Sequence, residues 1–137
     1  MTTYEQLLAD CIRWAKEAGR IQLELFRSDR LDIEAKFNDS DVVTNADKAS
    51  EKAIISEIRR AYPEHSVLSE EAGCDKRMND WLWVIDPLDG TTNYSSGLPN
   101  FCVSIGVQHK GQTVVGVVYA PYLGEIFTAV RGKGAFL

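Results

Sequence analysis

Residues 81–93 read WLWVIDPLDGTTN, an apolar run that passes directly into a polar segment containing glycine. The apolar residues 81–85 indicate a buried strand, and we expect Pro87 to stop its pairing because proline has no backbone N–H to donate. The turn that follows can bring Asp86 and Asp89 onto one side, and loops just beyond a strand end often carry active-site groups. Two carboxylates held close together repel each other unless a cation neutralises them. This stretch therefore predicts a strand that ends in a metal site.

The chemistry of this segment favours a hard cation. Its ligands are all oxygens, which suit Mg²⁺ better than Zn²⁺, and the backbone carbonyl of Leu88 could add another oxygen. Glu70 follows a short strand candidate at 66–68. It would complete the set of metal ligands if the ends of this strand and of the strand at 81–85 lie side by side. Residues 90–92 supply a flexible backbone, two hydroxyls and a helix start, whose free N–H groups bind phosphate well. The competing interpretation is a plain turn after the strand, with the acidic residues solvated.

The rest of the chain divides into a helical half and a strand half. Apolar residues recur with a 3.6-residue period over 4–27, and Asn45 can cap a second helix that Pro63 stops. Later segments are rich in β-branched and aromatic residues, which indicates an antiparallel meander. These strand candidates cover 101–108, 113–119, 125–130 and 135–137. We therefore predict an α+β fold in which two N-terminal helices pack on an antiparallel sheet.

Composition narrows the class of protein. The chain has 137 residues, which suits one domain, with 15 basic and 20 acidic side chains and a net charge of −5. Mild acidity with scattered basic residues argues against a nucleic-acid partner and against attraction to a membrane surface. No apolar run approaches the ~20 residues that span a bilayer. The three cysteines lie far apart, as expected of reduced thiols. We expect a cytoplasmic protein whose partner is a small molecule.

The segment 86–93 resembles the signature of the inositol monophosphatase family, the Mg²⁺-dependent, lithium-sensitive phosphatases related to fructose-1,6-bisphosphatases. Glu70-Glu71, Asp47 and Lys36 also stand at the spacings which that family shows. The resemblance extends over essentially the whole chain. It implies the N-terminal part of a layered αβαβα sugar-phosphatase fold.

The resemblance also implies a role for each site residue. Metal ions would be held by Glu70, Asp86, the carbonyl of Leu88, and Asp89. Asp47 and Thr91 would be catalytic, because together they would orient and help deprotonate the metal-bound water that attacks phosphorus. The substrate would be bound by Lys36, Glu70, Asp89, Gly90, Thr91 and Thr92. The implied function is Mg²⁺-dependent hydrolysis of a small phosphate monoester such as inositol monophosphate.

One departure from the family concerns length. Members are about twice as long as this chain, in keeping with two domains, and their second half supplies a Trp-Asp motif and most substrate-selecting contacts. This sequence has no Trp-Asp pair. We therefore expect residues 1–137 to form an N-terminal metal- and phosphate-binding domain that lacks the family's C-terminal domain. Relatives are commonly homodimers, so the resemblance allows a homodimer, but the sequence does not define the oligomeric state.

Two other functions fit parts of the pattern. The first is a catalytically incomplete fragment, or a regulatory or binding module on the same scaffold, because a fold does not fix a function. Some relatives are associated with transcription complexes. The second is the aspartyl-nucleophile phosphatases, whose signature also contains Asp-Gly-Thr. Their chemistry needs two aspartates separated by one residue, whereas two residues separate Asp86 from Asp89.

Overall fold

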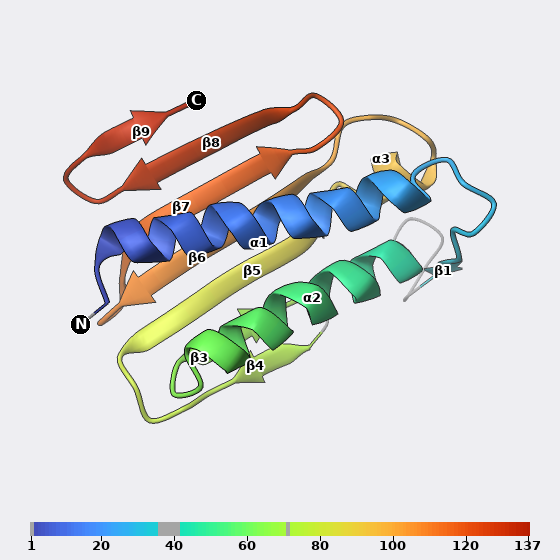
Figure 1. Cartoon of the computed structure of the whole chain (residues 1–137). Coiled ribbons are helices and arrows are strands. Elements are labelled where there is room, and N and C mark those ends of the chain that lie inside the picture. The colour runs from blue at the N-terminus through green and yellow to red at the C-terminus, as the bar shows by residue number, and fades with distance from the viewer. Residues whose placement is uncertain (1, 36–41, 71) are drawn as a thin grey trace.

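Two long helices cover one face of a seven-stranded sheet in the computed structural model, which describes residues 2–35, 42–70 and 72–137 (Figure 1). Helix α1 spans Tyr4–Leu25 and helix α2 spans Asn45–Ala61. The sheet runs in the order β4-β3-β5-β6-β7-β8-β9. Its strands are β3 (Ser66–Ser69), β4 (Gly73–Asp75), β5 (Trp81–Asp89), β6 (Cys102–His109), β7 (Gln112–Ala120), β8 (Glu125–Val130) and β9 (Gly134–Phe136).

The expected α+β class is confirmed, although the sheet is mixed rather than wholly antiparallel. Strands β3 and β5 are parallel, and every other neighbouring pair in the sheet is antiparallel. Strand β4 is the reason that β3 and β5 are parallel. The sequence did not indicate this strand, because its three residues are exposed and show no apolar alternation. The chain reverses through β4 before it enters β5, so β3 and β5 run in the same direction. Their carboxyl ends therefore meet at one edge of the sheet.

Three further short elements complete the fold. A separate antiparallel pair is formed by β1 (Ile33–Ala35) and β2 (Val42–Thr44), and helix α3 (Thr91–Ser95) follows β5. The expected polar loop at 38–41 and the candidate residue Lys36 lie outside the described residues.

Capping boxes define the starts of both long helices. Thr3 caps α1, with its hydroxyl accepting from the Gln6 backbone N–H at 3.1 Å and the Gln6 side chain accepting from the Thr3 N–H at 2.9 Å. The cap of α2 is Thr44, not Asn45 as expected, because Thr44 pairs reciprocally with Asp47. Asn45 instead bonds to the loop before it, accepting from the Asp32 N–H at 3.0 Å. Among the described residues, no helix is long and apolar enough to cross a membrane.

The core lies between the helices and the sheet. The apolar stripe of α1, including Leu7, Cys11 and Trp14, is buried against inward-facing strand residues such as Val103 and Val115. A Cβ at Gly19, also on α1, would lie 2.4 Å from a ring carbon of Tyr119. The Tyr119 ring can pack this closely on helix α1 because glycine has no side chain.

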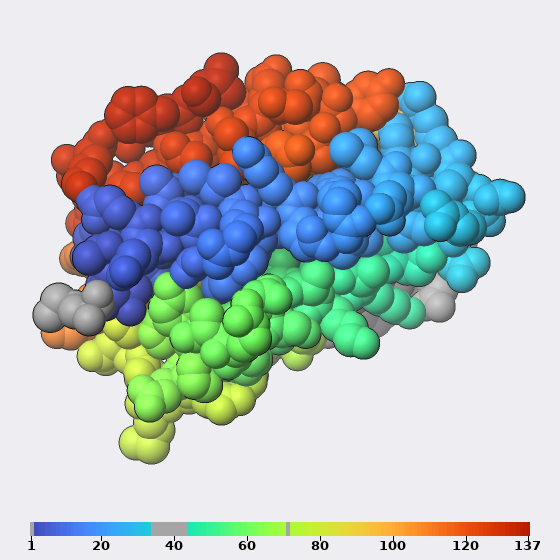
Figure 2. All heavy atoms as spheres, in the orientation of Figure 1, coloured from blue at the N-terminus to red at the C-terminus, as the bar shows by residue number. Residues whose placement is uncertain are grey.

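The opposite face of the sheet is open. Val118, Phe127 and Phe136 are exposed on strands β7 to β9, by 37%, 43% and 65%, respectively. They contribute to an apolar groove of about 490 Å³. In the space-filling view the helices cover the middle of the near face, and β8 and β9 extend beyond α1 (Figure 2). The two layers thus bury one face of the sheet only.

Candidate active site

Acidic residues meet where the parallel strands β3 and β5 end. Ser69, the last residue of β3, pairs in register with Ile85, so Glu70 and Asp86 follow at neighbouring positions. This is the side-by-side arrangement that the sequence predicted for the two strand ends. Glu71 lies outside the described residues.

Strand β5 does not stop at Pro87, contrary to expectation, but continues to Asp89 through a bulge. Asp86 pairs with Ser104 and Asp89 with Cys102, so β5 advances three residues while β6 advances two. A bulge tolerates a proline because the extra residue leaves the regular hydrogen-bond ladder. Asp86 is half-buried and Asp89 exposed as a result. The bulge therefore aims the two carboxylates from a rigid strand rather than from a free loop.

Asp47 is the link between helix α2 and this strand end. It is buried, and its Oδ2 accepts bonds from the Thr44 hydroxyl at 2.6 Å and the Thr44 backbone N–H at 2.8 Å. Its other oxygen, Oδ1, accepts from the Thr91 hydroxyl at 2.8 Å. The Thr91 oxygen also lies 3.1 Å from the carbonyl oxygen of Leu88. Thr91 is thus held between the helix carboxylate and the bulge.

The sequence contained a signal for Thr44 that our site prediction did not use. Thr44-x-x-Asp47 is the pattern of a capping box, in which side chain and backbone pair reciprocally. The cap explains why Asp47 stays buried and oriented. It leaves one oxygen of Asp47 directed at Thr91.

Gly90 makes the turn from β5 into α3 possible. Its φ is +89°, in the left-handed region that favours glycine. A Cβ there would lie 2.6 Å from the backbone oxygen of Asn100. Thr91 and Thr92 then begin the short helix, with Thr92 exposed beside the site. Substitution of this glycine would displace both threonines.

The electrostatic setting of Asp86 is unusual. Burial and, after it, the negative charges of Asp89, Glu70 and Asp47 together raise the pKa of its carboxyl to about 6. A backbone hydrogen bond from Leu88 opposes the shift. A carboxyl whose pKa is raised by neighbouring negative charges is a natural ligand for a cation.

The residues present fit a hard divalent cation in donor type, because carboxylate and carbonyl oxygens are its preferred ligands. Within residues 2–35, 42–70 and 72–137, however, no three His, Cys, Asp or Glu side chains converge closely enough to form a ready ligand cage. The acidic side chains are therefore close enough to interact electrostatically but are not drawn together around one point.

A thiol that the sequence did not single out borders the site. Cys102 Sγ lies 3.9 Å from Asp89 Oδ2, and both line an open cavity of about 360 Å³ beside Gly90. Burial and the adjacent carboxylates raise the pKa of Cys102 to about 11. The thiol therefore stays protonated at neutral pH.

An α+β domain with acidic strand ends and a carboxylate-bound threonine has the features of a phosphatase scaffold. The sequence profile of the inositol monophosphatase family matches residues 3–137, and the chain belongs to that family. Nus factor SuhB of Pasteurella multocida is 51% identical over 131 residues, which cover 94% of this chain and 49% of the relative.

Solved structures agree with the fold. Staphylococcal inositol monophosphatase-1, in a 100 mM LiCl soaked inhibitory complex, is 28% identical with a TM-score of 0.89 and covers 99% of this chain and 52% of that one. An IMPase/NADP phosphatase complexed with Mg²⁺ and phosphate is 27% identical with a TM-score of 0.85, covering 98% and 51%. This chain spans about half the length of the curated relatives it matches.

Proposed function

We propose that this chain carries the metal- and phosphate-binding half of a Mg²⁺-dependent phosphatase that hydrolyses a small phosphate monoester such as inositol monophosphate. The observation that carries the proposal is the hydrogen bond from Thr91 to Asp47, set against the acidic strand ends around Asp86. This arrangement unites a general-base pair with hard-cation ligands at one edge of the sheet. The solved relative with Mg²⁺ and phosphate supports the same chemistry.

In this proposal Glu70, Asp86, Asp89 and the Leu88 carbonyl hold Mg²⁺. When bound, the metal neutralises charge on the phosphate and supplies a more acidic water. Asp47 keeps Thr91 Oγ1 fixed, because the Thr44 cap leaves one carboxylate oxygen of Asp47 for that bond.

The paired Asp47 and Thr91 then accept and move the proton released as water attacks phosphorus. Three further residues are assigned to the substrate phosphate. They are Gly90, Thr92 and Lys36.

The test is phosphate release from inositol monophosphate by the 137-residue chain, with Mg²⁺ and then with added Li⁺. Release that requires Mg²⁺, falls with Li⁺ and is lost in Asp86→Asn supports the proposal. Absence of both Mg²⁺ binding and release would refute it.

A binding or regulatory role is the second candidate, and two observations favour it. Curated relatives bear the name Nus factor SuhB, and this chain spans about half their length. Mg²⁺ binding without turnover of any phosphate monoester would favour this candidate. Measuring Mg²⁺ binding and phosphate release separately therefore distinguishes the two functions.

A further inference from the structure

We infer that Gln22 of helix α1 is a positioning residue, which orients the bulge of β5 and through it the carboxylate of Asp86. The inference rests on the proposed function, because it concerns the same site. Gln22 is fully buried, although long polar side chains are seldom found in a core. Its Nε2 donates to the carbonyl oxygen of Pro87 at 2.6 Å. Pro87 lies inside the bulge, between Asp86 and Leu88.

The position of this bond in the backbone explains its effect. The carbonyl of Pro87 and the N–H of Leu88 belong to one planar peptide unit, so fixing one direction fixes the other. Asp86 and Leu88, whose carboxylate and carbonyl are the proposed metal ligands, flank Pro87 in the bulge. Gln22 thereby holds the peptide plane that lies between these two ligands. Without an amide donor from α1, the peptide would be free to rotate within the bulge.

Gln22 also connects the bulge to the other helices of the site. Its Nε2 donates to the Ser50 hydroxyl at 3.1 Å, and Ser50 lies one turn after Asp47 on α2. Its main-chain oxygen accepts from the Tyr94 hydroxyl of α3 at 2.7 Å. One buried residue thus joins the three elements that carry Asp86, Asp47 and Thr91.

A purely structural role explains this residue poorly. Among the described residues, Gln22 Oε1 has no hydrogen-bond partner although it is buried. A buried acceptor without a partner lowers stability, so the amide is not an efficient stabiliser of the core. Its donor bonds go to the bulge and to α2, the elements that carry Asp86 and Asp47.

The test compares Gln22→Met with Ser50→Ala by calorimetric titration with Mg²⁺. Methionine keeps the length and volume but has no donor, so Mg²⁺ affinity should fall by about 10- to 100-fold, as for other residues that orient metal ligands. Ser50→Ala removes the other partner of the same amide but leaves the bond to Pro87. It should change the affinity by less than about threefold.

Hydrogen exchange at the Leu88 amide, measured without metal, gives a second readout. Exchange should become faster in Gln22→Met and stay unchanged in Ser50→Ala. Gln22→Leu is a second apolar variant if Gln22→Met fails to fold, and circular dichroism checks both. If the parent chain binds no Mg²⁺, the proposed function fails, and Leu88 exchange alone decides the role of Gln22. Unchanged Leu88 exchange in a folded Gln22 variant overturns the inference.

Discussion

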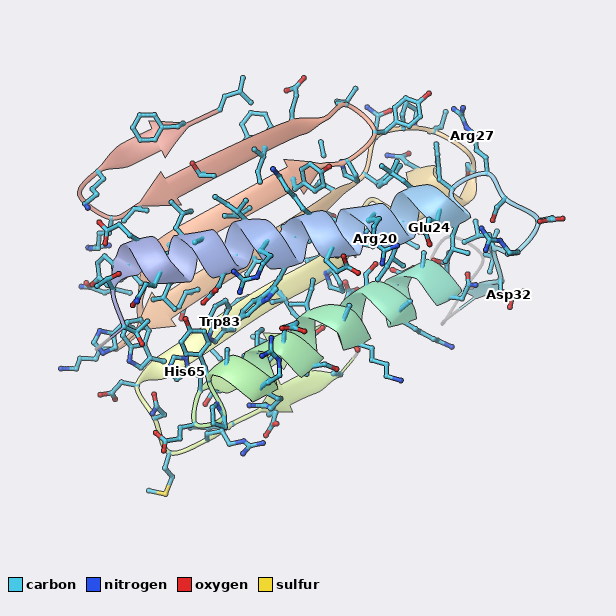
Figure 3. The ribbon with its side chains drawn as sticks, in the orientation of Figure 1. Arg20, Glu24, Arg27, Asp32, His65 and Trp83 are labelled. Atoms are coloured by element: carbon cyan, nitrogen blue, oxygen red, sulfur yellow. The ribbon has the colours of Figure 1, made fainter. Side chains whose placement is uncertain are left out.

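The two ends of strand β5 differ in how completely the chain satisfies its own polar groups. At the start, Trp83 is buried, and its Nε1–H donates to His65 Nδ1 at 2.9 Å (Figure 3). At the other end, Asp86 is surrounded by further carboxylates that raise its pKa. The Trp83 donor is satisfied within the chain, whereas the acidic end has negative charge in excess. The strand is thus anchored at one end and acidic at the other.

The aromatic end is a ladder of stacked rings. His65 stacks on Tyr62 at 4.8 Å and on Trp81 at 5.5 Å between ring centroids, and Trp81 stacks on His109 at 4.0 Å. Burial lowers the pKa of His65, which favours the neutral ring that accepts the Trp83 bond. The stacked rings therefore anchor this end of the strand.

Among the predicted effects, that of Asp86→Asn at the acidic end should be the largest. It removes the carboxylate at the centre of the acidic end, so Mg²⁺-dependent phosphate release should be abolished and Mg²⁺ binding weakened more than about 100-fold. Without metal, the variant should melt no lower than the parent at pH 7, because the substitution removes like-charge repulsion. Calorimetric titration and thermal melting measure the two effects. A large loss of metal-free stability would contradict this interpretation.

Thr91→Ala tests the proton-handling part of the acidic end. It removes the hydroxyl bound to Asp47, so the rate of phosphate release should fall on the order of 100-fold. Mg²⁺ affinity should stay near that of the parent. Thr91→Ser is the matched control, since it keeps the hydroxyl and should retain most of the rate. If Thr91→Ala instead loses Mg²⁺ binding, the hydroxyl has been given the wrong role.

His65→Phe tests the aromatic end. The stacked ring is kept, but the Trp83 N–H loses its acceptor, and an unpaired buried donor should cost about 2 kcal/mol of unfolding free energy. Mg²⁺ binding should be unaffected, because the change lies at the opposite end of β5. Urea denaturation and calorimetric titration check the two statements. A parallel loss of Mg²⁺ affinity would show that the two ends are coupled.

A change of pH should alter Mg²⁺ affinity at the acidic end by a smaller factor than the Asp86→Asn substitution does. Mg²⁺ and a proton compete for Asp86, whose pKa is about 6, so affinity should rise about tenfold from pH 5 to pH 7. Titration calorimetry at both pH values measures this ratio.

Metal-free stability should respond to pH in the opposite direction. The pKa of Asp86 is higher in the folded chain than its usual unfolded value, so its contribution is present at low pH and is lost as pH rises through about 6. The stability difference between Asp86→Asn and the parent should therefore shrink between pH 7 and pH 4. A difference independent of pH would mean that Asp86 titrates normally.

Local patterns in the sequence were sufficient to predict most of the helices and strands. The period of the apolar residues predicted α1 and α2, and the meander from β6 to β9 followed from its β-branched residues and turns. Pro87 was misread because a bulge depends on the partner strand β6, which local propensity does not represent. Strand β4 was missed for a similar reason, since its pairing with β3 is its one structural signal.

The sequence by itself determined the residue types of the site. The segment 86–93, with Glu70 and Asp47, supplies oxygen donors and hydroxyls, because their chemistry is a property of the side chains themselves. Only the tertiary structure decided which of them meet. The bond from Thr91 to Asp47 and that from Gln22 to Pro87 span 44 and 65 residues along the chain. Such contacts follow from the packing of α1 and α2 on β5, which no local pattern encodes.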